Sequence, residues 1–125
     1  QELSSASESN ISIAFVPHLA PLSQGISSTI FLEPKDRDGI TATKIHQMYK
    51  EFYESEPFVR VLPLDHIPSI SNVVSTNYCD IGIVYSNELG KIVISSVLDN
   101  MVKGAVGQVI QNINIMFGLE EKTGL

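Results

Sequence analysis

The chain has 125 residues, a hydrophobic content of 43% and a formal net charge of −6. This length fits one domain or a piece of one, and an acidic chain without a basic run argues against a nucleic-acid partner. No apolar stretch reaches the roughly 18 residues of a membrane-spanning helix, and the N-terminal residues lack the features of a signal peptide. The single cysteine favours a reducing compartment, so we expect a cytoplasmic protein.

The N-terminal quarter predicts two strands separated by a loop. The polar, Ser-rich residues 1–10 are expected to be a frayed end or the tail of an earlier helix. Ile11–Phe15 alternates and is rich in β-formers, which predicts a strand. Val16–Gly25 contains two prolines and a glycine, which indicates a loop, and Ile26–Leu32 predicts the second strand.

The middle of the chain predicts a helix, a short strand and a long irregular stretch. Thr41–Tyr53 carries apolar residues at helical spacing, and Thr41 is a suitable N-cap. Phe58–Leu62 is rich in β-formers and predicts a short strand. Pro63–Asn77 contains two prolines and several serines, so we expect no regular structure there.

Two further β-rich runs, Cys79–Tyr85 and Ile92–Leu98, flank a turn at residues 87–90 and predict a hairpin. Strands therefore come in neighbouring pairs and do not alternate strictly with helices. This order indicates an α+β fold with a mainly antiparallel or mixed sheet and helices on one face. No Gly-rich strand-to-helix fingerprint is present, so the chain carries no dinucleotide-binding fold of its own.

Residues 100–118 predict a helix in which Lys103 is the only charged residue. Its apolar residues recur at helical spacing: Val102, Val106, Val109, Ile113 and Met116. Its other flank holds small residues and amides: Gly104, Gly107, Gln108, Gln111 and Asn114. A helix without a charged face is usually buried on both sides, so we expect a partner layer outside this chain. Buried amides need partners, and those of Gln108, Gln111, Asn112 and Asn114 fit contacts to another domain or a ligand.

His18 is the strongest catalytic candidate from the residues alone. It lies in a Pro-flanked loop between two predicted strands, and imidazole transfers protons near neutral pH. The alternative is a histidine that only hydrogen-bonds to the backbone. His46 and His66 are expected to be surface residues. The histidines and the cysteine are widely spaced and form no zinc pattern, so no metal is expected.

Structural roles are sufficient to explain Cys79 and the residues at the start of the last helix. A thiol hydrolase that combines Cys79 with His18 is conceivable, but no spacing supports it, and a buried structural thiol is the preferred interpretation. Asp99 or Asn100 could simply cap the last helix.

Three collinear segments resemble one family, N-acetyl-gamma-glutamyl-phosphate reductase, the NADPH-dependent step of arginine biosynthesis. The segments are Phe15–Phe31 (FVPHLAPLSQGISSTIF), Tyr49–Pro63 (YKEFYESEPFVRVLP) with Asn77–Gly82 (NYCDIG), and Asp99–Leu125. The resemblance runs from about residue 11 to the end. It implies that the chain is a single C-terminal catalytic and dimerisation domain of the glyceraldehyde-3-phosphate-dehydrogenase type, with residues 100–118 packed on an NADP-binding domain outside this sequence.

The resemblance also implies a reaction. In the family, a cysteine thiolate attacks N-acetyl-gamma-glutamyl phosphate and displaces phosphate, and NADPH then reduces the thioester to the semialdehyde. His18 stands in the family's FVPHL-type motif and is implied to be the acid/base. The nucleophile belongs to a Gly-Cys-Tyr-Pro-like motif that this sequence does not contain, so Cys79 inherits no role and the chain is expected to be inactive alone.

The remaining site residues follow from the same resemblance. Asn100, Gly104 and Gln108 are expected near the cofactor, because the family's last helix packs close to the nicotinamide end. Gln24 occupies a position for substrate binding at which the family usually has an arginine, and glutamine supplies no charge there. The full enzyme is expected to be a homo-oligomer. The alternative is a stand-alone binding or dimerisation module that kept this domain without the catalysis.

Overall fold

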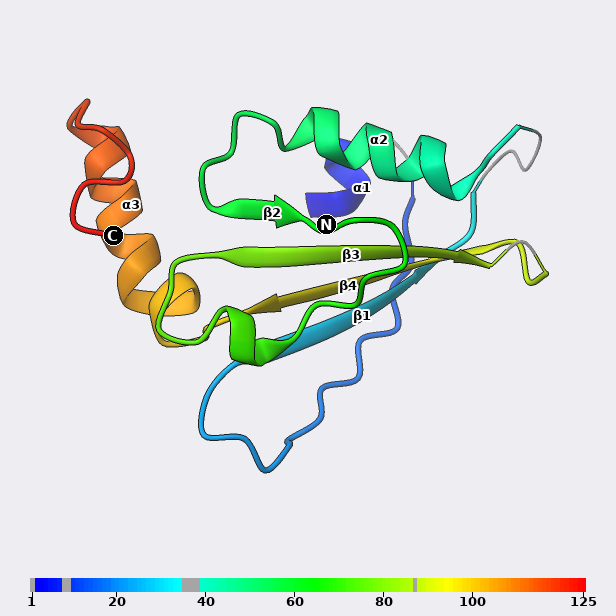
Figure 1. Cartoon of the computed structure of the whole chain (residues 1–125), viewed down its shortest axis with the longest axis horizontal. Helices are drawn as coiled ribbons and strands as arrows, with labels where there is room; N and C mark the ends of the chain where they lie inside the picture. Colours follow the sequence, from blue (N-terminus) through cyan, green and yellow to red (C-terminus); the bar gives the residue numbers. More distant parts are fainter. Residues whose placement is uncertain (1, 8–9, 35–38, 87) are drawn as a thin grey trace.

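A computed structural model describes residues 2–7, 10–34, 39–86 and 88–125 of the chain (Figure 1). No helix in these ranges is long and apolar enough to cross a membrane. The elements in chain order are α1 (Glu2–Ala6), β1 (Ile26–Leu32), α2 (Ala42–Phe52), β2 (Val59–Val61), the 3-10 turn η1 (Ile70–Asn72), β3 (Cys79–Ser86), β4 (Lys91–Leu98), the π-helical η2 (Val102–Val106) and α3 (Gly107–Met116).

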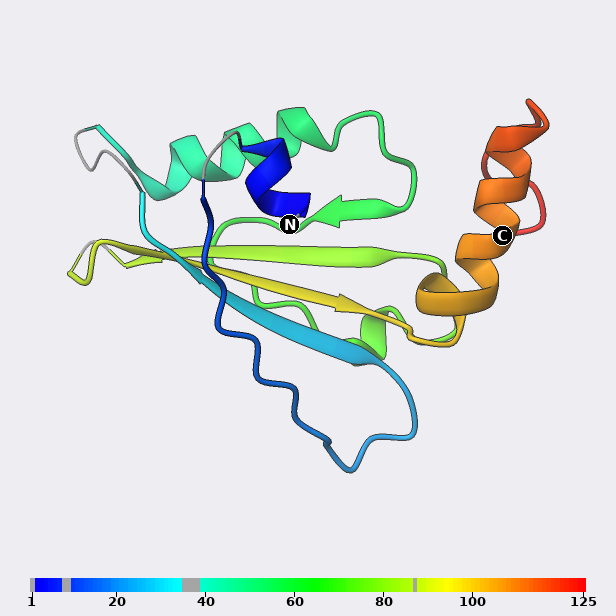
Figure 2. The same cartoon turned by 180° about the vertical axis from the view of Figure 1, so that it is seen from behind.

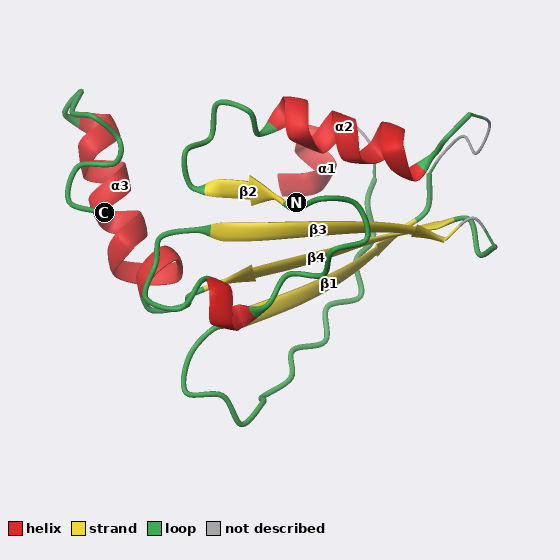
Figure 3. Ribbon diagram, viewed as in Figure 1, coloured by secondary structure: helices red, strands yellow, loops and turns green. Residues whose placement is uncertain are grey.

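The strands form one four-stranded sheet in the order β1-β4-β3-β2 (Figure 3). β3 and β4 are the predicted hairpin, and β1 also pairs antiparallel with β4, whereas β2 is parallel to β3. The predicted mixed sheet with helices is therefore confirmed. The β2–β3 pairing is parallel because the irregular segment between them returns the chain to the same end of the sheet.

The hydrophobic core lies between the sheet and α2, where Ile45 packs with Ile81, Ile83 and Ile94. The segment between β2 and β3 crosses the opposite face. It passes so close that a Cβ atom at Gly82 would lie 2.5 Å from the carbonyl oxygen of His66. Glycine at this position therefore lets the sheet be covered on both faces at β3.

Helix α2 begins as predicted, because the Thr41 side chain caps it by accepting a hydrogen bond from the Lys44 amide at 3.2 Å. The strand predicted at Ile11–Phe15 is wrong. Residues 10–20 have no regular structure, and Phe15 is 84% exposed. Alternation indicates a strand only where a neighbouring strand supplies backbone partners, and β1 has its partner in β4.

The predicted last helix is present, but its first part is the π-helix η2, and the chain covers it on one side. Its small and amide residues face the domain: Gly107, Gln111 and Asn114 are buried. Val102 and Ile110 are half-buried, whereas the apolar residues of the outer flank are exposed, with Val109 at 56% and Met116 at 79%. Both views show α3 at one end of the sheet, away from α2 (Figures 1 and 2). Its apolar flank therefore faces away from the hydrophobic core.

Candidate functional site

A buried carboxylate organises the junction between β4 and the last helix. Asp99 is 0% exposed and accepts four hydrogen bonds. Its Oδ2 accepts from the Ser75 amide at 2.6 Å and from Nε2 of Gln24 at 2.9 Å. Its Oδ1 accepts from the amides of Met101 at 2.8 Å and Val102 at 3.0 Å. Asp99 thus caps the helix, as predicted, and also ties two distant segments to it.

The hydrogen bonds keep this carboxylate ionised. The Ser75 amide makes the largest contribution in lowering the pKa of Asp99, burial opposes it, and the amides of Val102 and Met101 and the Gln24 side chain lower it further. A fixed negative charge at the first turn of a helix is also stabilised by the helix dipole. The site therefore holds a buried carboxylate whose ionised form is favoured by its hydrogen bonds.

Asn100 continues the same junction. Its Oδ1 accepts a hydrogen bond from the Gly25 amide at 2.6 Å, so Gln24 and Gly25 are both held by the two residues that precede the last helix. Gly25 has a φ of +114°, a conformation that favours glycine. The structure thus brings together two of the predicted site residues, Gln24 and Asn100.

His18 lies six positions before Gln24, in the exposed segment 10–23 that leads to the junction. His18 is exposed in the part of the chain that the structure describes, so its imidazole is accessible to groups from outside the domain. Its predicted catalytic role, and the predicted contact of Gln24 with substrate, remain predictions.

Gly104 and Gln108 lie further along the same helix. A Cβ atom at Gly104 would meet only ordinary contacts, the nearest at 3.5 Å from Leu98 Cδ1, so the fold itself does not require glycine there. Glycine leaves the helix backbone open to close approach by a ligand. Gln108 is half-buried and donates to Asn112 Oδ1 at 3.0 Å. The predicted proximity of Asn100, Gly104 and Gln108 to the cofactor remains a prediction.

A second polar cluster was not predicted from the sequence. Gln111 Oε1 accepts from Asn77 Nδ2 at 3.0 Å and from Lys103 Nζ at 2.6 Å, and Gln111 Nε2 donates to Glu121 at 2.6 Å. The prediction that Gln111 and Asn114 contact another domain or a ligand is wrong, because both amides bind within this chain. The sequence feature that could have indicated this cluster is the row of amide side chains in a helix whose only charged residue is Lys103.

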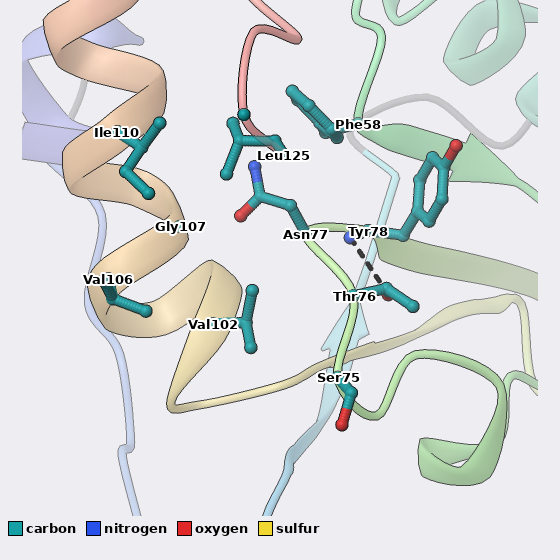
Figure 4. Close-up of a pocket in the computed structure, with 11 residues that line it drawn as sticks. Phe58, Ser75, Thr76, Asn77, Tyr78, Val102, Val106, Gly107, Ile110 and Leu125 are labelled. Atoms are coloured by element: carbon teal, nitrogen blue, oxygen red, sulfur yellow. Dashed lines mark hydrogen bonds between the residues drawn. The ribbon is translucent and has the colours of Figure 1, made fainter.

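This cluster borders a cavity of about 470 Å³ between the last helix and the segment before β3 (Figure 4). Asn77 projects into the gap between Gly107 and Leu125, with Phe58 and Tyr78 beside it. Burial lowers the pKa of Lys103, and the charges of Cys79, Glu121 and Glu56 oppose this. The cluster fixes α3 and the C-terminal residues to the domain.

The other candidate side chains have local partners. Cys79 Sγ lies 3.3 Å from Ser96 Oγ at the edge of the core. His46 is half-buried rather than a surface residue, and its Nε2 donates to the Leu62 carbonyl at 2.7 Å, whereas His66 is exposed. Among the residues that the structure describes, no three histidine, cysteine or carboxylate side chains are grouped to hold a metal ion.

Comparison with known protein families gives the class of protein. The chain belongs to the family described as semialdehyde dehydrogenase, dimerisation domain, whose model matches residues 1–100. Over its whole length it is similar to N-acetyl-gamma-glutamyl-phosphate reductases. It is 52% identical over 125 residues to that of Clostridium kluyveri, covering 100% of this chain and 36% of the relative. It is 48% identical over 128 residues to that of Geobacter sulfurreducens, with the same coverage of 100% and 36%.

A solved structure supports the fold assignment. Aspartate semialdehyde dehydrogenase II from Vibrio cholerae matches with a TM-score of 0.60 and 17% sequence identity, covering 78% of this chain and 28% of that one. This likeness concerns the fold alone. The chain spans 36% of the length of the reductases that it matches.

Proposed function

We propose that this chain is the C-terminal part of an NADPH-dependent, cytoplasmic reductase. The enzyme converts N-acetyl-gamma-glutamyl phosphate to N-acetylglutamate semialdehyde and phosphate. The similarity to reductases of that name over the full chain supports the assignment. The share of 36% leaves room in such a protein for a nucleotide-binding domain and a nucleophilic cysteine. The 125-residue chain alone is then inactive.

The exposed apolar flank of α3 supports the part of this proposal that places a further domain against this chain. Val109, Ile113 and Met116 are 56%, 45% and 79% exposed, and Phe117 follows at 74%. Large contiguous apolar patches rarely remain bare on soluble proteins and mark an interaction surface. In the proposed enzyme the helix at residues 100–118 packs on the NADP-binding domain through this flank.

His18 is proposed as the acid/base of the reaction. An imidazolium beside a thiol lowers the pKa of the thiol, and the same ring can exchange protons with the departing and forming oxygens. Its exposure on the segment before β1 leaves it free to face a cysteine from the rest of the protein. NADPH supplies the hydride when bound. Asn100, Gly104 and Gln108 are proposed to lie against its nicotinamide end.

A second copy of the chain is proposed to cover one face of the sheet. The matched family is described as a dimerisation domain and its model ends at residue 100, before η2 and α3. Within that range, Ile26, Ile30 and Leu32 of β1 are 47%, 44% and 40% exposed. Ile30 pairs with the buried Ile94, so this stripe continues the face that carries the core. Homo-oligomerisation through β1 would bury it.

Kinetics of the full-length protein test the assignment. It should oxidise NADPH in the presence of N-acetyl-gamma-glutamyl phosphate, whereas residues 1–125 alone should not. His18→Ala should lower kcat about 100-fold or more while NADPH binding stays nearly unchanged. His66→Ala is the matched control, since His66 is an exposed loop histidine that contacts the Leu64 carbonyl, and it should keep full activity. Turnover by the isolated chain would contradict the proposal.

The alternative of a stand-alone binding or dimerisation module makes the opposite prediction. The hydrogen bond from Gln24 to Asp99 is compatible with such a module, because the Gln24 side chain has a structural partner within the chain. A natural protein whose coding frame begins close to Gln1, and which forms a stable dimer without reductase activity, would support the module.

A further inference from the structure

We propose that Gln24 is a positioning residue that anchors the His18 segment to the start of the last helix through Asp99. The inference rests on the proposed function, because it assigns to Gln24 the placement of the acid/base rather than contact with substrate. The fully buried carboxylate of Asp99 takes one of its four hydrogen bonds from the Gln24 side chain.

The anchor stands at the end of a segment with few contacts of its own. Residues 10–23 are exposed throughout, and Gln24 and Gly25 are the first half-buried residues before β1. Two hydrogen bonds hold them: Gln24 Nε2 donates to Asp99 Oδ2 at 2.9 Å and the Gly25 amide donates to Asn100 Oδ1 at 2.6 Å. The direction in which the chain leaves β1 toward His18 is therefore set at this junction.

The chemistry of Asp99 fixes the orientation of the Gln24 amide. An ionised carboxylate only accepts hydrogen bonds, so the amide nitrogen must be the group that points at it. The Ser75 amide shares the same oxygen at 2.6 Å, which holds the carboxylate in place from the other side. A side chain that donates to Asp99 can keep the anchor, and one that carries negative charge must break it.

This rule separates substitutions of similar size. An arginine at position 24, the residue usual in the resembled family, donates to a carboxylate and keeps the anchor. Gln24→Glu places a second carboxylate against Asp99 and repels it at neutral pH. Below about pH 5 a proton shared by the two carboxylates restores one hydrogen bond. The variant should therefore show a recovery at low pH in addition to any pH dependence of the unmodified protein.

The chain offers a matched control for this substitution. Gln47 Nε2 donates to Glu51 Oε1 at 2.8 Å on the exposed surface of α2. Gln47→Glu repeats the change of an amide to a carboxylate that faces a carboxylate, away from the junction. Exposed charge pairs contribute little to stability, so this variant should behave like the unmodified protein.

Steady-state kinetics of the full-length protein with N-acetyl-gamma-glutamyl phosphate and NADPH test the inference. For Gln24→Glu we expect kcat to fall about 10- to 100-fold, since a small misplacement of a catalytic group has effects of this size. The KM for the acyl phosphate and the affinity for NADPH should change less than about twofold, and lowering the pH should recover part of kcat relative to Gln47→Glu. Gln24→Arg should retain kcat.

Three results would overturn the inference: equal kinetics of Gln24→Glu and Gln47→Glu, a raised KM with unchanged kcat, or loss of kcat in Gln24→Arg equal to that in Gln24→Glu. An unmodified full-length protein without reductase activity would instead refute the proposed function. The anchor is then decided by hydrogen exchange of the Gly25 amide, which donates to Asn100. Faster exchange in Gln24→Glu than in Gln47→Glu supports the anchor, and equal exchange overturns it.

Discussion

The side-chain oxygen of Asn77 packs directly against the backbone of Gly107, at a separation that leaves no space for a Cβ atom. This oxygen is buried and has no hydrogen-bond partner among the described residues. Its orientation follows from the neighbouring Gln111, whose Oε1 already accepts from Lys103 and therefore requires the amide nitrogen of Asn77 on its other side. Close helix packing at Gly107 is thus linked to the polar cluster that fixes α3.

Gly107→Ala is expected to destabilise the chain by about 1–3 kcal/mol, because the new methyl group overlaps Asn77 and Val102 and forces the helix outward. Urea unfolding of the 125-residue chain measures this. Gly104→Ala is the matched control, since a Cβ atom there meets its nearest neighbour at 3.5 Å. It should be neutral or stabilising by up to about 1 kcal/mol. Equal effects of both variants would contradict the packing argument.

In the full-length protein, Gly104→Ala also tests the proposed contact with the cofactor. If the backbone at Gly104 faces the cofactor as proposed, a methyl group there obstructs the approach without disturbing the fold. Gly104→Ala is expected to weaken NADPH binding about tenfold or more while its unfolding midpoint is unchanged or slightly raised. Fluorescence titration with NADPH measures this, and unchanged affinity would remove Gly104 from the proposed cofactor contacts.

Arg60 and Asp80 form the ion pair on the face of the sheet opposite α2. Arg60 Nε and Nη2 donate to the two carboxylate oxygens at 2.6 and 2.9 Å, and the Asp80 side chain is 2% exposed. Arg60→Ala leaves a buried carboxylate unpaired, and we expect a loss of about 3 kcal/mol in urea unfolding. Lys91→Ala, which removes the exposed pair with Glu33 at 3.2 Å, should cost less than about 1 kcal/mol. Equal losses of unfolding free energy in the two variants would contradict the larger role of the buried ion pair.

The strands and α2 were predictable because their signals are local. The cap at Thr41, the β-rich runs of the hairpin and the strand at Ile26–Leu32 each carry their information within a few residues. Ile11–Phe15 has the same alternation as a strand, but an edge partner for it comes from distant parts of the chain and is not encoded locally. The structure therefore departs from the prediction where tertiary pairing decides.

The candidate site was predictable only where a short segment of the sequence carries the information. Asn100 and Gln24 were singled out by resemblance, but the hydrogen bonds of Gln24 to Asp99 and of Gly25 to Asn100 join residues 75 positions apart, which no local pattern reveals. In the last helix, periodicity identified an apolar and an amide flank without indicating which one faces the domain. The partners of Gln111, at Asn77 and Glu121, lie 34 and 10 positions away and determine the answer.

The pH dependence of stability should report on Asp99. The pKa of its carboxyl is lower in the folded chain than the ordinary value of 3.8, so its contribution is fully present above that value. The contribution is lost as the pH falls through the lower folded-state pKa, because the folded state then takes up a proton. Urea midpoints measured from pH 6 downward should fall in the unmodified chain. Asp99→Asn should be less stable at pH 6 and show a weaker decline, and parallel curves would contradict this assignment.

The two exposed apolar surfaces should have separable effects on association of the isolated chain. We expect residues 1–125 to self-associate beyond a dimer, because the flank of α3 is uncovered in addition to the stripe on β1. Val109→Lys places a charge on α3 and should reduce the assembly to a dimer in light scattering. Adding Ile30→Lys on β1 should then give a monomer. A monomer formed by Val109→Lys alone would assign the dimer contact to α3, and a monodisperse unmodified monomer with an ordered last helix would contradict both surfaces.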